Sequence, residues 1–120
     1  MSALGVHVLL ELADCDKKML NNPRRIKEIL VEAARRARVT IVKTTIHKFN
    51  PYGVSGVVVI AESHISIHTW PEHGCAAVDI FTCGKGLEPD LAAEFIIKEF
   101  CAQKYRMDKI PRITDGFLLP

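Results

Sequence analysis

Side chains that can do chemistry are concentrated in one short part of the sequence, residues 62–83. Three of the five histidines and two of the four cysteines of the 120-residue chain lie there. The segment combines hydroxyl, thiol, imidazole and carboxylate groups, carried by Glu62, Ser63, His64, Ser66, His68, Glu72, His73, Cys75, Asp79 and Cys83. Such groups serve as nucleophiles, as general acids and bases, or as metal ligands. We therefore expect the functional site within this segment.

The spacing in the first part of this segment indicates a strand with two different faces. Because successive side chains of a strand point to opposite faces, Ile65 and Ile67 share an apolar face. The other face carries His64, Ser66, His68 and Trp70. Lysine or glutamate would serve a merely solvated face better, so this stripe favours a functional role.

Several kinds of site fit these residue types, and spacing alone does not choose among them. Structural zinc normally uses pairs of closely spaced ligands, unlike the candidate ligands His64, His68, His73 and Cys75. A hydrolase built on Ser63 and His68 lacks the GxSxG motif, and a Cys83–His68 pair has no supporting local signature. The remaining interpretation is a sheet that carries hydrogen-bonded histidines without a catalytic role. On spacing alone, this interpretation receives about half of the weight.

Strands and turns that would position these residues follow from hydropathy and β-branched residues. Strands are predicted at residues 4–12, 39–49, 54–60, 65–70 and 76–82. Residues 50–53 form a turn between the second and third strands, which indicates a hairpin. A second turn is expected at residues 71–74, and residues 14–22 are expected to be a polar connection.

Two amphipathic helices complete the predicted elements. Asn22-Pro23 is a typical helix start, and apolar residues then recur at helical spacing through Ala37. Pro89 opens a second helix that is expected to run to about Lys104. The stretch from Asp108 contains two prolines and a glycine and is expected to be irregular.

This order of elements predicts an α+β fold with one domain covering residues 1–120. The expected architecture is a two-layer sandwich, with a mainly antiparallel sheet and two helices on one face. The other face of the sheet then needs cover, which a second copy of the chain would supply. We therefore expect a dimer.

Composition limits the classes of partner and compartment. Apolar residues make up 48% and charged residues 25%, which is typical of a globular protein and excludes a disordered tail. The net charge of +2 is too small to indicate a nucleic-acid partner. No stretch approaches the roughly 20 apolar residues that span a bilayer. Four cysteines without a CxxC pair or a signal peptide indicate a reduced, cytoplasmic protein.

A longer pattern in the same region resembles a known family. The run GVSGVVVIAESHISIHTWPEHG, followed by AVDIFTCG, is similar to the prokaryotic S-adenosylmethionine decarboxylases of the small, pyruvoyl-dependent form. These enzymes make decarboxylated S-adenosylmethionine, the aminopropyl donor for spermidine synthesis. The resemblance implies a proenzyme that cuts itself at Glu62-Ser63 into residues 1–62, the beta chain, and residues 63–120, the alpha chain.

The resemblance also implies roles in this cleavage. The hydroxyl of Ser63 would attack the carbonyl of Glu62 and turn the amide into an ester. A base, matched by His68, would remove the α-proton of Ser63, and elimination would expel the Glu62 carboxylate. Hydrolysis of the remaining dehydroalanine releases ammonia and leaves a pyruvoyl group derived from Ser63. Ser55 matches a position that orients the groups handling the ester.

In the decarboxylation that follows, the resemblance implies that the pyruvoyl group is the only cofactor, with no metal. Its carbonyl forms a Schiff base with the substrate amine and accepts the electrons released with carbon dioxide. Cys83 matches the family's proton donor to the α-carbon, since an ordinary thiol is mostly protonated at neutral pH. The alternative for Cys83 is an ordinary buried cysteine.

Substrate-binding residues are assigned from neighbouring positions. Phe49 and Trp70 could hold the sulfonium and the adenine ring, although ordinary hydrophobic packing explains them equally well. Glu72 could accept hydrogen bonds from the ribose, or it could be only a turn residue. After the WPE motif the family pattern has aromatic residues, whereas this chain has His73 and Cys75, to which we assign no role. A further expectation is that Cys75 lies close to Cys83.

Three alternative functions remain. An archaeal arginine decarboxylase uses the same machinery, although the aromatic residues Phe49, Tyr52 and Trp70 favour S-adenosylmethionine. An uncleaved regulatory relative would have no need of Ser63, His68 and Cys83 together, so the presence of all three argues against this alternative. A thiol or metal protein that merely shares the fold should depend on an oxidant or a metal. The working unit is expected to be a dimer, either of proenzymes or of alpha/beta pairs, with the active site near the shared interface.

Overall fold

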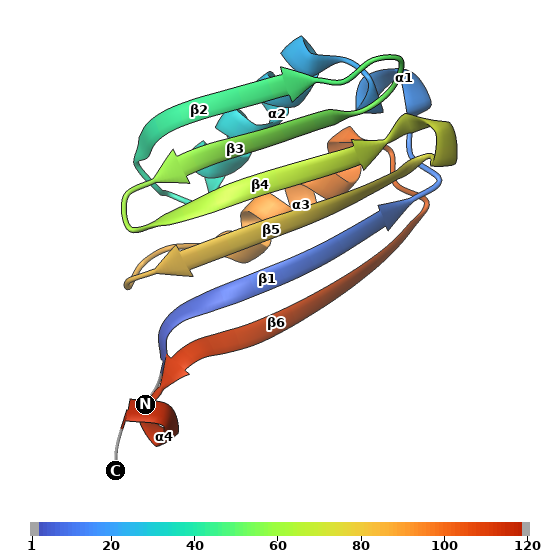
Figure 1. The fold of residues 1–120 in the computed structure, drawn as a ribbon. Coiled ribbons are helices and arrows are strands. Elements are labelled where there is room, and N and C mark those ends of the chain that lie inside the picture. Colours follow the sequence, from blue (N-terminus) through green and yellow to red (C-terminus); the bar gives the residue numbers. More distant parts are fainter. Residues whose placement is uncertain (1–2, 119–120) are drawn as a thin grey trace.

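The computed structural model describes residues 3–118, which form a six-stranded antiparallel sheet with helices (Figure 1). The strands are β1 (Ala3–Ala13), β2 (Ile41–Lys48), β3 (Val54–Ile60), β4 (Ser63–Trp70), β5 (Cys75–Cys83) and β6 (Lys104–Thr114). Their order across the sheet is β2-β3-β4-β5-β1-β6, and every neighbouring pair is antiparallel. The first strand therefore lies between β5 and the C-terminal strand.

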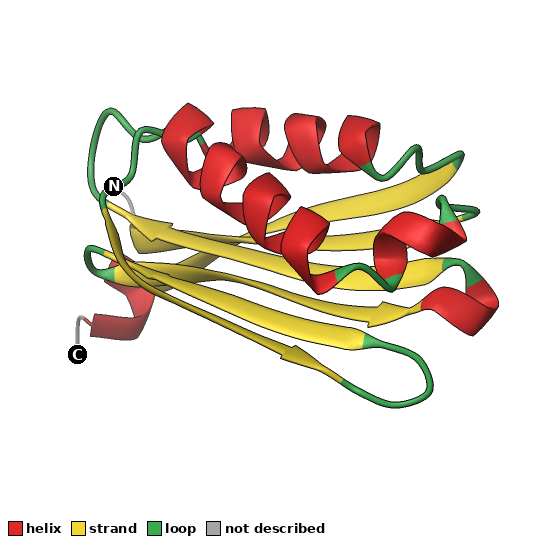
Figure 2. Cartoon of the chain, turned by 90° about the horizontal axis from the view of Figure 1, so that it is seen from above, coloured by secondary structure: helices red, strands yellow, loops and turns green. Residues whose placement is uncertain are grey.

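Two helices, α2 (Pro23–Arg36) and α3 (Pro89–Glu99), cover one face of this sheet (Figure 2). α2 packs against β2 and β3, and α3 packs against β1 and β5. The predicted two-layer α+β sandwich with two helices on one face is confirmed. The short helical segments are α1 (Lys17–Leu20), inside the connection predicted to be merely polar, η1 (Pro71–His73) and α4 (Asp115–Leu118). Within residues 3–118, no helix has the length and apolar character needed to cross a membrane.

Helix α2 begins where its sequence predicts. The side chain of Asn22 accepts a hydrogen bond of 3.0 Å from the N–H of Arg25, and Pro23 occupies the first turn. This is the expected N-cap, because the first N–H groups of a helix have no partner within the helix. The apolar side of the helix is fully buried, with Ile26, Ile29, Leu30, Ala33 and Ala34 in the core.

Helix α3 ends at Glu99, earlier than the predicted end near Lys104. Cys101 adopts a left-handed backbone with φ 54°, and the N–H of Ala102 donates back to the carbonyl of Ile97 at 3.1 Å. This arrangement is the common helix stop in which glycine usually takes the left-handed position. Because a cysteine occupies this position, the sequence contains no glycine that would predict the end of the helix.

The prediction that the chain is irregular from Asp108 onwards is wrong. Residues 108–114 belong to β6, which pairs with β1 from Lys104 opposite Ala13 to Thr114 opposite Ala3, residues 115–118 form α4, and residues 119–120 lie outside the described part of the chain. Pro111 lies within the strand and cannot donate a hydrogen bond. An edge strand tolerates proline because one side of it has no neighbouring strand to bond.

The two faces of the sheet differ in burial. The face under the helices is apolar and buried. Along each strand, its side chains alternate with those of the second face. We call the face away from the helices the open face. By strand register, its central residues are His7 and Leu9 of β1, Ser55, Val57 and Val59 of β3, His64, Ser66, His68 and Trp70 of β4, and Cys75, Ala77, Asp79, Phe81 and Cys83 of β5.

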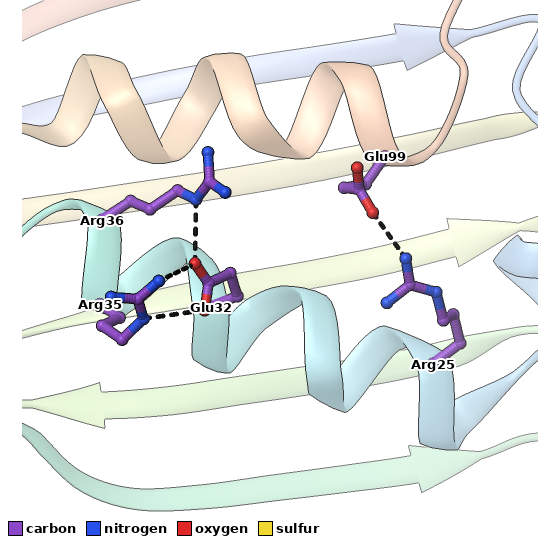
Figure 3. Close-up of polar contacts among 5 residues, drawn as sticks. All are labelled: Arg25, Glu32, Arg35, Arg36 and Glu99. Carbon is purple, nitrogen blue, oxygen red and sulfur yellow. Dashed lines mark hydrogen bonds and ion pairs between the residues drawn. The ribbon is translucent and has the colours of Figure 1, made fainter.

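Ion pairs support the helix layer (Figure 3). Arg25 of α2 donates to Glu99 of α3 at 2.6 Å, which links the two helices. Within α2, Glu32 accepts two hydrogen bonds from Arg35, at 2.9 and 2.5 Å, and one from Arg36 at 3.0 Å. Hydrogen bonds from Arg35, and then from Arg36, lower the pKa of Glu32 to about 2. Glu32 therefore stays ionised in all but strongly acidic solution.

Candidate active site

The bond between Glu62 and Ser63 lies in a tight turn between β3 and β4. Ile60 and Ser63 are paired across the two strands, so only Ala61 and Glu62 form the turn. Glu62 has φ 70°, in the left-handed region that is unfavourable for a residue with a β-carbon. The Ser63 hydroxyl donates a hydrogen bond to the carbonyl oxygen of Glu62. The nucleophile of an N-to-O shift thus lies beside the carbonyl that it would attack.

Cys83 lies at the same end of the sheet as this bond. Ser63 is the first residue of β4 and Cys83 is the last residue of the neighbouring strand β5. The register pairs His64 with Phe81, which brings the two strand ends together. Cys75 is the first residue of β5, about 26 Å away at 3.3 Å per residue. The expectation that Cys75 lies close to Cys83 is therefore wrong for one chain.

Ser55 and His68 form a second group, away from the Glu62–Ser63 bond. The Oγ atom of Ser55 lies 2.8 Å from Nδ1 of His68 across the β3–β4 pair. His68 follows Ser63 by five residues, a distance of about 16 Å along a strand. An odd spacing also places the two side chains on opposite faces. One chain alone therefore does not bring His68 to the Glu62–Ser63 bond.

The three candidate substrate-binding residues lie toward the His68 end of the sheet. Phe49 is 47% exposed and Trp70 is 45% exposed, so packing in the core does not account for them. Trp70 lines a pocket of about 520 Å³ on this side of the sheet. Glu72 lines a neighbouring pocket of about 330 Å³, together with Lys17, Lys18, Asn21, Tyr52 and Pro71. The two residues therefore face different hollows in a single chain.

Comparison with known proteins decides the family. A family model described as S-adenosylmethionine decarboxylase matches residues 6–113. The S-adenosylmethionine decarboxylase proenzyme of Thermodesulfovibrio yellowstonii is 55% identical over 100 residues, covering 83% of this chain and 74% of the relative. The proenzyme of the same name from Pyrococcus abyssi is 45% identical over 112 residues, covering 93% and 81%. The chain belongs to the S-adenosylmethionine decarboxylase family.

A solved structure agrees with this membership. The crystal structure of the adenosylmethionine decarboxylase from Aquifex aeolicus matches with a TM-score of 0.88 and 35% identity. The match covers 94% of this chain and 93% of that one. The names of these relatives refer to S-adenosylmethionine, so the arginine and non-catalytic alternatives are not favoured.

The residues around the Glu62–Ser63 bond fit the pyruvoyl group that membership of the decarboxylase family implies. A pyruvoyl group must arise from a residue with a side-chain hydroxyl next to a reactive carbonyl, and Ser63 has both. Residue 63 begins a central strand, so pairing with β3 would hold the new chain end in place. Among residues 3–118, no group of three or more His, Cys, Asp or Glu side chains is arranged to hold a metal ion.

Sequence reasoning missed two residues of β1, His7 and Gly5, which lie toward the Cys83 end of the sheet. His7 of β1 lies on the open face beside Asp79 and Phe81, and Gly5 is paired directly with Cys83. The one available signal was strand alternation, which places His7 on the face opposite the apolar Val8. Its position beside Cys83 depends on the pairing of β1 with β5, which is a contact between distant parts of the chain.

Proposed function

We propose that this chain decarboxylates S-adenosylmethionine after cutting itself between Glu62 and Ser63. The observation that carries the proposal is the hydrogen bond from the Ser63 hydroxyl to the Glu62 carbonyl, in a turn with a left-handed Glu62. Membership of the decarboxylase family, whose relatives are named proenzymes, supports it. Cleavage yields residues 1–62 and 63–120, which the pairing of β3 with β4 keeps together.

The cleavage uses three side chains of this protein. Ser63 attacks the carbonyl carbon of Glu62, and the peptide nitrogen leaves as the amine of the ester. His68 removes the α-proton of residue 63, and the Glu62 carboxylate departs. The hydrogen bond between Oγ of Ser55 and Nδ1 of His68 fixes the orientation of the His68 ring while it handles this proton.

In decarboxylation, the pyruvoyl group at residue 63 supplies a carbonyl electron sink. Cys83 donates a proton to the α-carbon of the product from its place at the same end of the sheet. The donor must remain a thiol to do this. All four cysteines lie in the described part of the chain and are free, which supports a cytoplasmic, reducing location.

The separation of Ser63 from His68 supports a homodimer. Two copies can stack their open faces about a two-fold axis that lies in the plane of contact and runs perpendicular to the strands. In such a dimer, each end of one sheet lies over the opposite end of the partner subunit's sheet. The end of the sheet that carries Cys83 and the Glu62–Ser63 turn in one subunit then lies over Ser55 and His68 of the partner subunit. The same arrangement would bring Trp70 of the partner subunit toward the reacting carbon, with Phe49 and Glu72 nearby to hold adenine and ribose.

Intact mass under denaturing, reducing conditions tests the cleavage. We expect two fragments divided between residues 62 and 63, with the second lighter than a serine-terminated peptide by one ammonia. The variant Ser63→Ala should stay whole. The purified protein should release carbon dioxide from S-adenosylmethionine and not from arginine. A wild-type chain that stays uncut after long incubation would overturn the proposal.

Co-expression of Ser63→Ala and His68→Ala chains tests the shared site. Each variant alone should stay uncut. In a mixed dimer, the His68→Ala chain still has Ser63 and receives His68 of the partner subunit, so about half of the His68→Ala chains should be cut. No cleavage in the mixture, with wild type cut as expected, would show that the site does not form between subunits.

A further inference from the structure

His7 lies in a cluster on the open face that the cleavage and proton-transfer steps above do not use. Its Nδ1 atom is 2.9 Å from Nη1 of Arg112, and its Nε2 atom is 3.3 Å from Oδ1 of Asp79. Ser66 donates to the other oxygen of Asp79 at 3.1 Å. The His7 side chain is only 17% exposed. The cluster spans β6, β1, β5 and β4.

The partners of His7 determine where its proton lies. A guanidinium has only donors, so Nδ1 of His7 must accept from Arg112. The proton of the neutral ring is therefore on Nε2, which is buried and faces the Asp79 carboxylate. The contact with Arg112 thus fixes the tautomer of the imidazole, and its buried Nε2 lies 3.3 Å from Asp79 without a hydrogen-bond partner among the described residues.

The same ring sets the position of Phe81. The ring centroids of His7 and Phe81 are 5.4 Å apart, those of His64 and Phe81 are 6.0 Å apart, and those of the two histidines are 6.2 Å apart. The guanidinium carbon of Arg112 lies 5.6 Å from the Phe81 centroid. Phe81 therefore packs against both imidazoles, and the three rings form one contiguous group.

Phe81 and Cys83 meet over a position without a side chain. Gly5 is paired with Cys83, and a β-carbon at Gly5 would lie 2.7 Å from Cε1 of Phe81 and 2.9 Å from Sγ of Cys83. Both side chains therefore occupy the space that Gly5 leaves free. A shift of the Phe81 ring must change the space available to the Cys83 sulfur.

We propose that His7 is a positioning residue for proton donation, which acts through Phe81 to hold the Cys83 thiol over Gly5. This inference rests on the proposed function, because it takes Cys83 as the proton donor. A donor works only at hydrogen-bond distance from the carbon it protonates. A misplacement of about 1 Å can cost about 100-fold in rate.

The test combines His7→Phe with two different measurements. Phenylalanine keeps a ring beside Phe81 but loses the contacts with Arg112 and Asp79. In the self-cleaving chain we expect kcat for S-adenosylmethionine to fall by about 10- to 100-fold with KM unchanged within about twofold. In the uncut Ser63→Ala chain, we expect the rate of Cys83 alkylation by iodoacetamide, resolved by peptide mass spectrometry, to change by at least about threefold.

Controls separate positioning from general damage. The exposed Cys101, at the end of α3, is an internal reference whose alkylation rate should not change. His73→Phe makes the same replacement in the exposed η1 segment and should leave kcat unchanged. Arg112→Met should shift Cys83 alkylation in the same direction as His7→Phe. The double variant should be no worse than His7→Phe, because the two residues act as one unit.

The inference would be overturned if the rate of Cys83 alkylation is unchanged in both His7→Phe and Arg112→Met. This holds even if the wild-type chain cuts itself and is active. Unchanged kcat in a His7→Phe chain that cuts itself would also overturn it. If the wild-type chain stays uncut, the proposed function fails. The alkylation measurement, made in the uncut chain, still decides in that case whether His7 positions the thiol.

Discussion

At the residue level, the bond proposed for cleavage is held in an unfavourable backbone. Glu62 takes a left-handed conformation at φ 70° without being a glycine, which costs about 1–2 kcal/mol. The paired residues Ile60 and Ser63 impose the turn, because their strands continue on both sides of it. Cutting the bond frees residue 62 from this conformation. The strain therefore favours cleavage over the intact turn.

Glu62→Gly tests this relation, because glycine adopts the left-handed region without penalty. In the uncut Ser63→Ala background, we expect the free energy of unfolding in urea to rise by about 0.5–1 kcal/mol. In the otherwise wild-type chain, self-cleavage followed by mass should slow about two- to fivefold. Glu62→Ala removes the side-chain carboxylate but keeps the β-carbon and the main-chain carbonyl, and it should cleave at the wild-type rate. Equal rates for Glu62→Gly and Glu62→Ala would contradict the role of strain.

At the level of elements, the segment after β1 joins three parts of the fold. The N–H of Cys15 donates to the carbonyl of Gly74 at 3.0 Å, and the N–H of Asp16 donates to that of Phe100 at 3.0 Å. The Asp16 side chain also caps α1, accepting from the N–H of Lys18 at 3.0 Å. This docking buries Cys15. Burial, with smaller contributions from Cys75, Asp14 and Cys101, raises the pKa of the Cys15 thiol to about 11.

The raised pKa of Cys15 predicts a loss of stability in alkaline solution. Between pH 9 and 11 the unfolded chain loses the thiol proton while the folded chain keeps it, so the free energy of unfolding should fall as pH rises. Urea unfolding of the uncut Ser63→Ala chain, measured below and above pH 9, should show this decline. Cys15→Ala should show a smaller decline. Cys101 is exposed, so the Cys101→Ala variant should show the full decline. An equally reduced decline in the Cys15→Ala and Cys101→Ala variants would contradict the assignment of the effect to Cys15.

At the level of the whole molecule, the two parts of the proposed site lie toward opposite ends of the sheet. Ser63 and Cys83 lie at one end, and the Ser55–His68 pair lies toward the other. The open face also presents apolar side chains to solvent, including Val59, which is 41% exposed. A stacked pair of sheets would cover this surface and complete two sites at once.

A charge on the open face should disrupt both assembly and cleavage. Val59→Asp should elute in size-exclusion chromatography as a single 13.4 kDa chain and should not cut itself, because His68 of the partner subunit is then absent. Leu91→Asp is a matched control, since Leu91 is 43% exposed on the helix layer. It should keep the wild-type elution and cleavage. A monomeric Val59→Asp chain that still cuts itself would contradict a site shared between subunits.

Much of the fold could be predicted because its signals are local. Asn22-Pro23 starts α2 as predicted, and Ile65 and Ile67 are buried as their alternation requires. The errors came where a tertiary contact overrides local preference. Cys101 stops α3 in a place that usually needs glycine, and Pro111 sits in a strand because that strand is at the edge.

The sequence by itself determined which groups are available for chemistry and, through strand alternation, which of them share a face. It also contained the five-residue spacing that separates Ser63 from His68. Only the tertiary structure decided that β1 lies between β5 and β6, which brings Gly5 and His7 against Cys83 and Phe81. The physical reason is that helix caps and side-chain periodicity depend on neighbours in the chain. Strand order and register depend on burying the whole core at once, through contacts between residues far apart in sequence.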